Sequence, residues 1–170
     1  MSYFIRVTLA ICLVAAVHSA PVIAADAAPA TELKIDVPVQ LKSSKVVFNM
    51  DHLAFAGDQS IGLTHMKLVS QAYKASQTSL QIVAVFHGAA GYMLLNDAAY
   101  NKARRSEKGN PYKEIIASLQ NDGIQFEECG QTAKTNGWLN AALLPGVKVN
   151  SGANLRLVQL MLDGFIPLHP

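Results

Sequence analysis

The sequence predicts an α/β fold in which helices cover both faces of a mainly parallel sheet. Short apolar runs typical of strands alternate with segments whose apolar residues recur at helical spacing, and this alternation continues through one compact length of chain. The run Leu80–Phe86 is apolar at nearly every position, which favours a central strand buried on both faces.

The amino terminus is predicted to be a cleaved secretory signal peptide, residues 1–25. A short polar start precedes the apolar run Val7–Val17, which is too short to span a bilayer, and small residues typical of a cleavage site follow. We therefore expect an exported protein, periplasmic or secreted, with no membrane attachment after cleavage. A flexible segment at residues 26–43 would then lead into one domain at residues 44–170.

Composition limits the function of the mature chain. Without the leader and its Arg6, 13 basic and 12 acidic side chains remain, a balance that predicts no nucleic-acid partner. Of the two cysteines only Cys129 remains, so no disulfide can form within the mature chain. The core must hold the domain together, and we expect self-association to assist it.

Before the domain, the segment Leu33–Leu41 is interpreted either as an edge strand or as an arm onto a neighbouring subunit. The first half of the domain itself is expected to contain two strands and a helix. A strand at Lys45–Asn49 precedes a loop at Asp51–Ser60, and the central strand Leu80–Phe86 leads into a short helical segment around Tyr92–Leu95. The intervening helix has one apolar face: Leu63, Met66, Val69, Ala72 and Tyr73.

The second half continues the alternation. Asn110 and Pro111 are typical of a cap and first helical position, and the strand Ile124–Cys129 follows that helix. A brief strand at Val147–Val149 precedes the last helix, and Phe165–Leu168 is expected to form an edge strand because it contains proline. The last helix is capped by Asn150 or Ser151, ends at Gly164 and carries three apolar residues: Leu155, Val158 and Leu162.

Several short motifs follow one another between Lys45 and Pro170. They are Val83-Ala84-Val85-Phe86-His87-Gly88, Tyr92-Met93-Leu94-Leu95, Asn110-Pro111, Gly123-Ile124-Gln125-Phe126 before Cys129, Leu143-Leu144-Pro145-Gly146-Val147, and the closing Leu160–Pro170. As an ordered set they resemble an exported member of the DsrE/DsrF-like sulfur-relay family. The resemblance implies a three-layer α/β/α sandwich with a five-stranded sheet, assembled as a trimer or hexamer. It also implies a cysteine that carries sulfur as a persulfide, here Cys129, and a thiol or persulfide partner protein.

Cys129 is the first candidate catalytic residue. A thiolate is the nucleophile in sulfur chemistry, and a following helix or a nearby cation would lower the pKa of the thiol. Glu127 or Glu128 could instead raise that pKa, and a lone cysteine is often a small buried apolar residue. His87 also ends a strand, so it is a second candidate, as a base or hydrogen-bond donor. The alternative for His87 is a ring satisfied by backbone groups at a turn.

Four further residues are candidates for a ligand pocket: Gly88, Gly130, Thr132 and Trp138. Gly88 is interpreted as a tight turn or an anion cradle, and Gly130 leaves room for approach to the thiol. Thr132 could cap the turn after Cys129, while Trp138 could line a pocket, contact another subunit or cover the domain's own core.

Charged and metal-binding residues give weaker signals. Arg104, Arg105 and Lys108 are interpreted as an anion site or as a solvated loop. The sequence has no CxxC or HxxxH pairing around His52 or His65, so neither a metal site nor a cofactor is predicted.

Three functions from different classes are consistent with these residues. The first is a sulfur carrier, sulfurtransferase-like at most, that uses Cys129 as persulfide acceptor. The second is a non-catalytic oligomeric module that binds a small ligand between subunits, with Cys129 merely packed. The third is a metal or redox accessory protein of the exported compartment.

Overall fold

The computed structural model describes residues 32–170, and five of its strands form one parallel sheet. These strands are β1 (Ser44–Met50), β4 (Leu80–Phe86), β5 (Gln125–Cys129), β6 (Lys148–Asn150) and β7 (Ile166–Leu168). Their order across the sheet is β6-β5-β4-β1-β7, so β4 is central as predicted. A separate antiparallel pair, β2 (Phe55–Ala56) and β3 (Gln59–Ser60), forms within the predicted loop.

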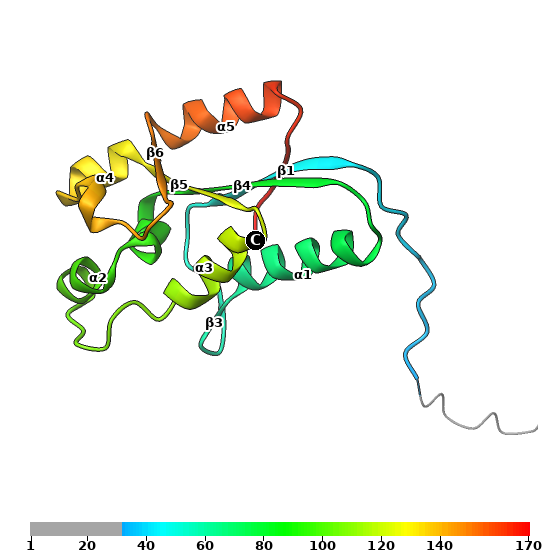
Figure 1. Cartoon of the computed structure of the whole chain (residues 1–170), viewed down its shortest axis with the longest axis horizontal. Coiled ribbons are helices and arrows are strands. Elements are labelled where there is room, and N and C mark those ends of the chain that lie inside the picture. The colour runs from blue at the N-terminus through cyan, green and yellow to red at the C-terminus, as the bar shows by residue number, and fades with distance from the viewer. Residues whose placement is uncertain (1–31) are drawn as a thin grey trace, which may run out of the picture. The chain divides into compact units, whose positions relative to one another are not determined.

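Helices lie on both sides of this sheet, which confirms the predicted α/β class (Figure 1). The α-helices are α1 (Ile61–Ala75), α2 (Asp97–Arg104), α3 (Lys113–Asn121), α4 (Gly130–Asn136) and α5 (Ala153–Leu162). Within residues 32–170, two 3₁₀ segments accompany these helices: η1 (Gly88–Leu94) and η2 (Asn140–Ala142). In Figure 1, α1 and α3 lie below the sheet and α5 lies above it.

Strand alternation divides the core into two layers. On β1, Phe48 packs in the layer with α1 and α3, while its neighbour Val47 packs in the layer with α5. On β5, Phe126 belongs to the first layer and Cys129 to the second. The thiol therefore lies on the α5 side of the sheet.

The strand register aligns the carboxyl ends of three neighbouring strands. Met50 of β1 pairs with Phe86 of β4, and Phe86 pairs in turn with Glu128 of β5. His87 and Cys129 each follow one member of the second pair, so the two candidate residues leave adjacent strands at the same edge. Parallel α/β sheets bind their ligands at this edge.

The amino-terminal predictions are only partly covered by the structure. The predicted signal peptide, residues 1–25, and the start of the flexible segment lie outside the described residues. Residues 32–43 contain no helix or strand, so the edge-strand interpretation of Leu33–Leu41 is wrong. Within residues 32–170, no helix has the length and apolar character needed to cross a membrane.

Two helices differ from the sequence-based expectation. No helix was predicted at α2, and of its residues only Arg104 was interpreted, as part of an anion site or a solvated loop. Asn96 caps this helix by accepting a hydrogen bond from the Ala99 N–H at 3.0 Å. On α5 the apolar residues that indicated the helix do not face the sheet. Leu155, Val158 and Leu162 are 73%, 51% and 83% exposed, and the helix packs instead through Ala153, Leu157 and Leu160.

Candidate functional site

Cys129 lies at the junction of β5 and α4, where it occupies the cap position of the helix. Its Sγ accepts a hydrogen bond of 3.3 Å from the backbone N–H of Ala153, the first residue of α5. Burial raises the pKa of this thiol, but hydrogen bonds from the Thr132 backbone, Ala153, the Thr132 hydroxyl and Gln131 outweigh it. The net pKa is lowered.

The thiol belongs to the wall of a surface pocket of about 320 Å³. His87, Gly88 and Thr132 line the same pocket, and the first turn of α5 closes another side. The Cys129 residue itself is only 5% exposed, so it sits in the wall rather than on the open surface. The structure thus places four of the six candidate residues together.

His87 shares the pocket but is held by another strand. Its Nε2 lies 2.8 Å from Oδ1 of Asn49, and the amide of Asn49 contacts His169 Nδ1 at 3.1 Å. Burial lowers the pKa of His87, against a smaller opposing effect of Asp51, so the neutral ring is favoured. Within residues 32–170 the structure contains no hydrogen bond between His87 and Cys129. His87 is therefore satisfied by a side chain rather than by the expected backbone group.

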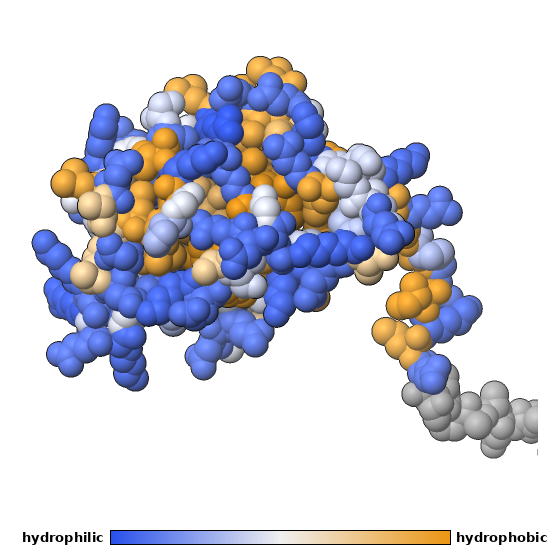
Figure 2. Space-filling model, viewed as in Figure 1, coloured by the Kyte–Doolittle hydropathy of each residue, from blue (hydrophilic) through white to orange (hydrophobic). Residues whose placement is uncertain are grey.

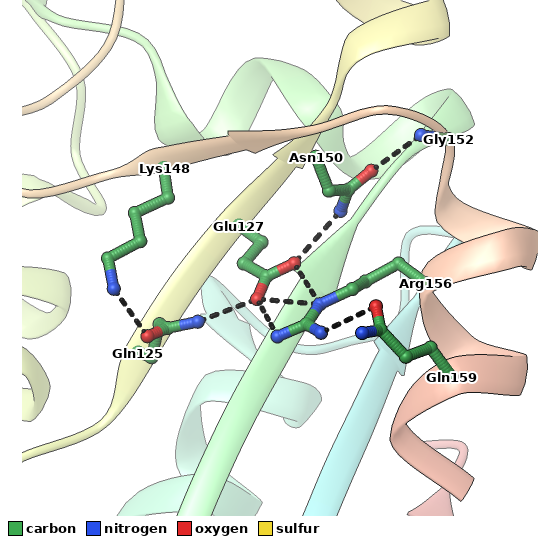
Figure 3. A network of polar contacts seen from close by, with 7 residues as sticks. All are labelled: Gln125, Glu127, Lys148, Asn150, Gly152, Arg156 and Gln159. Carbon is green, nitrogen blue, oxygen red and sulfur yellow. Dashed lines mark hydrogen bonds and ion pairs between the residues drawn. The ribbon is translucent and has the colours of Figure 1, made fainter. Parts of the chain in front are cut away.

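A buried ion pair fixes α5 against β5 (Figure 3). The carboxylate of Glu127 accepts hydrogen bonds from Arg156 Nε at 3.0 Å and from its Nη2 at 2.8 Å. Gln125 and Asn150 donate further hydrogen bonds to the same carboxylate. Burial raises the pKa of Glu127, but these partners outweigh it and hold the carboxyl ionised. This ion pair therefore holds in place the amino-terminal end of α5, where the Ala153 N–H donates to the thiol.

Glu128 points to the opposite face of the strand and has no such partner. Its side chain is fully buried, and neither carboxyl oxygen makes a hydrogen bond within the described part of the chain. A Cβ at Gly91 would lie 2.7 Å from Oε1, so η1 passes directly over the carboxyl group. Burial, with a further contribution from Cys129, raises the pKa of Glu128 to about 8. A protonated Glu128 places no negative charge beside the thiol.

The two glycines have structural roles. Gly88 adopts a φ of 56°, as a tight turn requires, and its N–H donates to the hydroxyl of Thr132 at 3.0 Å. A Cβ at Gly130 would lie 2.6 Å from the carbonyl oxygen of Asn150, so its small size admits β6 rather than a ligand. Thr132 links the two segments, because its hydroxyl accepts from Gly88 and donates toward the thiol.

Trp138 lies away from the thiol. It packs partly against the first core layer and lines a second cavity of about 520 Å³. Lys102 and Arg104 line that cavity too, whereas Arg105 and Lys108 do not.

The sequence analysis missed two residues of the site, Ala153 and Arg156. The backbone N–H of Ala153 donates to the thiol, and the Arg156 guanidinium pairs with the Glu127 carboxylate. A buried charge at Glu127 was the one available signal for Arg156, since such a charge requires a partner.

The fold and the site define a parallel α/β domain with a buried but solvent-adjacent thiol at the carboxyl edge of its sheet. The DsrE/DsrF-like family model matches residues 42–168, and the chain belongs to this family. The predicted sandwich fold is thereby confirmed.

Solved structures similar to this chain include the following two proteins. A protein of unknown function from Methanobacterium thermoautotrophicum, MTH1491, is 23% identical, with 75% of this chain and 100% of that chain covered and a TM-score of 0.59. The ychN protein of E. coli is 16% identical, with 75% and 99% covered and a TM-score of 0.48. No curated protein matches the sequence.

Proposed function

We propose that this protein is an exported sulfur carrier that holds sulfane sulfur on Cys129 as a persulfide. The observation that carries the proposal is the environment of the thiol. Sγ lies in a pocket wall, accepts the Ala153 N–H and has a lowered pKa, so the thiolate is favoured relative to an ordinary buried cysteine.

Loading of the carrier is a direct transfer between sulfur atoms. The Cys129 thiolate attacks the outer sulfur of a persulfide R–S–SH, the S–S bond of the donor breaks, and its electron pair leaves on R–S⁻. The product is Cys129–S–SH, which keeps the proton of the donor. Delivery is a second transfer of the same kind. The thiolate of an acceptor attacks the outer sulfur of Cys129–S–SH, the S–S bond breaks, and Cys129 leaves as thiolate. No external oxidant or reductant is required.

The roles of the neighbouring residues follow from their contacts. The Ala153 N–H and the Thr132 hydroxyl stabilise the thiolate, both as attacking group and as leaving group. The neutral His87 ring is hydrogen-bonded to Asn49 and lines the pocket through which a donor approaches the thiol. Protonated Glu128 leaves the thiolate without a repelling neighbour.

Self-association is part of the proposal. Leu155, Val158 and Leu162 form an exposed apolar stripe along α5, and hydrophobic residues gather over α5 at the top of Figure 2. An apolar stripe of this kind is typical of a surface covered by another chain. Leu155 also lines the thiol pocket, so a second copy seated on the stripe would border the site.

Mass spectrometry of the protein purified after export tests the carrier function. Export with cleavage after Ala24 or Ala25 would remove Cys12, so a gain of sulfur would report on Cys129 alone. After incubation with inorganic polysulfide we expect one added sulfur atom, lost on treatment with a reductant and absent in Cys129→Ser. Full sulfur-transfer activity in Cys129→Ser, or a thiol that resists alkylation until the protein is unfolded, would exclude the carrier function. An intact amino terminus on cytoplasmic protein would exclude the export.

A further inference from the structure

The cavity beside Trp138 adjoins the thiol pocket. Gly88 lines both, and α4 contributes Thr132 to the thiol pocket and Asn136 to the cavity. A volume of about 520 Å³ is within the range of small-molecule sites in proteins. A molecule held in this cavity would therefore lie directly beside the route to Cys129.

The charge of the cavity wall is positive. Lys102 and Arg104 line it, and none of the described lining residues is acidic. Within residues 32–170 neither cation takes part in an ion pair, although Asp97 at the start of the same helix pairs with Lys113. Two unneutralised cations on one concave surface favour an anionic occupant.

Aromatic rings hold one of these cations in place. The Arg104 guanidinium carbon lies 4.2 Å from the centroid of the Tyr92 ring, and its side chain also hydrogen-bonds Tyr100. The ring centroids of Tyr92 and Tyr100 are 5.8 Å apart. Trp138 adds an aromatic surface to the cavity wall. The cavity thus combines a fixed cation, a second cation and apolar surface, which suits an organic anion better than a bare inorganic one.

We propose that this cavity binds the organic part of a carboxylate-bearing, low-molecular-weight persulfide that donates its outer sulfur to Cys129. The inference rests on the sulfur-carrier function and names the class of its donor. The carboxylates would pair with Lys102 and Arg104, and the R–S–SH group would reach past Gly88 to the thiol. Transfer then follows the balanced step given above, and the thiol R–S⁻ leaves from the cavity.

Binding is tested first without sulfur transfer. S-methylglutathione carries two carboxylates and a thioether, so it can occupy the cavity but cannot donate sulfur. Because Trp138 is the only tryptophan of the chain, its fluorescence reports on occupancy. We expect a saturable change in the wild type and affinity about tenfold weaker in Lys102→Gln, from loss of one charged contact.

The controls separate this site from a general surface effect. Lys108→Gln removes another exposed positive charge, one that does not line the cavity, and it should bind as the wild type does. The dimethyl ester of S-methylglutathione, which lacks both carboxylate charges, should not bind. Equal binding of ester and acid, equal loss in both variants, or phosphate binding as tightly as S-methylglutathione would overturn the assignment.

Loading kinetics connect the cavity to the thiol. Transfer from subsaturating glutathione persulfide to Cys129 should slow about tenfold in Lys102→Gln, whereas loading by inorganic polysulfide should be unchanged. If polysulfide loads Cys129 but S-methylglutathione does not bind, the carrier function stands and the donor site is refuted. If S-methylglutathione binds but neither donor loads Cys129, the carrier function fails and the assignment as a donor site fails with it.

Discussion

The backbone N–H of Ala153 donates a hydrogen bond of 3.3 Å to Sγ of Cys129, which connects the first residue of α5 to the last residue of β5. This contact depends on the position of α5, and the Glu127–Arg156 ion pair fixes that position one helical turn further on. The chemistry of the thiol is therefore coupled to a charge pair that does not touch it.

Substitution Arg156→Ala should both destabilise the domain and weaken the thiolate. It leaves Glu127, whose side chain is 4% exposed, without its cationic partner, and such a loss costs about 3 kcal/mol of unfolding free energy. Urea unfolding measures this loss. In the folded variant, alkylation of Cys129 should move to higher pH, because the Ala153 N–H is held less firmly.

Gln159→Ala is the matched control. It removes the exposed partner of the same guanidinium and leaves Glu127 paired, so stability should change by less than about 0.5 kcal/mol. An Arg156→Ala protein as stable as the wild type would show that the ion pair does not hold α5.

The Thr132 hydroxyl should lower the pKa of the thiol. Thr132→Val keeps the shape of the side chain and removes the hydrogen bond to the thiolate, so the pH profile of Cys129 alkylation should shift to higher pH. Thr135→Val makes the same change at an exposed position of α4 and should leave the profile unaltered. Identical profiles for Thr132→Val and the wild type would remove Thr132 from the site.

Glu128 should make the fold less stable as pH rises. Its pKa is about 8 in the folded protein, against 4.5 for an ordinary glutamate, so the folded state binds one proton more between these values. The contribution of Glu128 to stability is then complete below about pH 4.5 and is lost as the pH rises toward 8, at about 1.4 kcal/mol per pH unit.

Glu128→Gln should abolish this dependence. Urea midpoints measured between pH 5 and pH 8 should show the variant gaining stability relative to the wild type as pH rises, by about 1.4 kcal/mol per unit. Glu114→Gln, at an exposed position of α3, should follow the wild type throughout. Parallel pH curves for Glu128→Gln and the wild type would mean that Glu128 titrates normally.

The sequence predicted which segments form strands and helices better than it predicted which of these elements lie side by side. The apolar run Leu80–Phe86 left no alternative to a central strand, and Gly123 correctly separated α3 from β5. The proximity of His87 and Cys129 was beyond prediction, because it depends on the register between β4 and β5, which only the folded sheet defines. Arg156 and Glu127 are 29 residues apart in the sequence, and only the packing of α5 beside β5 brings them together.

The failures have local causes. Helix α2 is short and rich in alanine and charge, so it lacks the apolar periodicity that marks a buried helix, and Asn96-Asp97 was its only start signal. Helix α5 has apolar residues on two sides, and periodicity cannot decide which side meets the sheet. The structure selects Leu157 and Leu160, leaving the stripe that contains Leu162 exposed.

That exposed stripe should mediate self-association. Leu162→Glu places a charge at an 83% exposed position, so the isolated chain should fold normally while an interface that buries Leu162 should lose its affinity. Sedimentation of the wild type should show an oligomer, and the variant should dissociate to monomer at the same concentration. Leu68→Glu makes the same change at a 57% exposed leucine of α1 and should remain oligomeric. A monomeric wild type, or an oligomer that survives Leu162→Glu, would show that the apolar stripe does not mediate self-association.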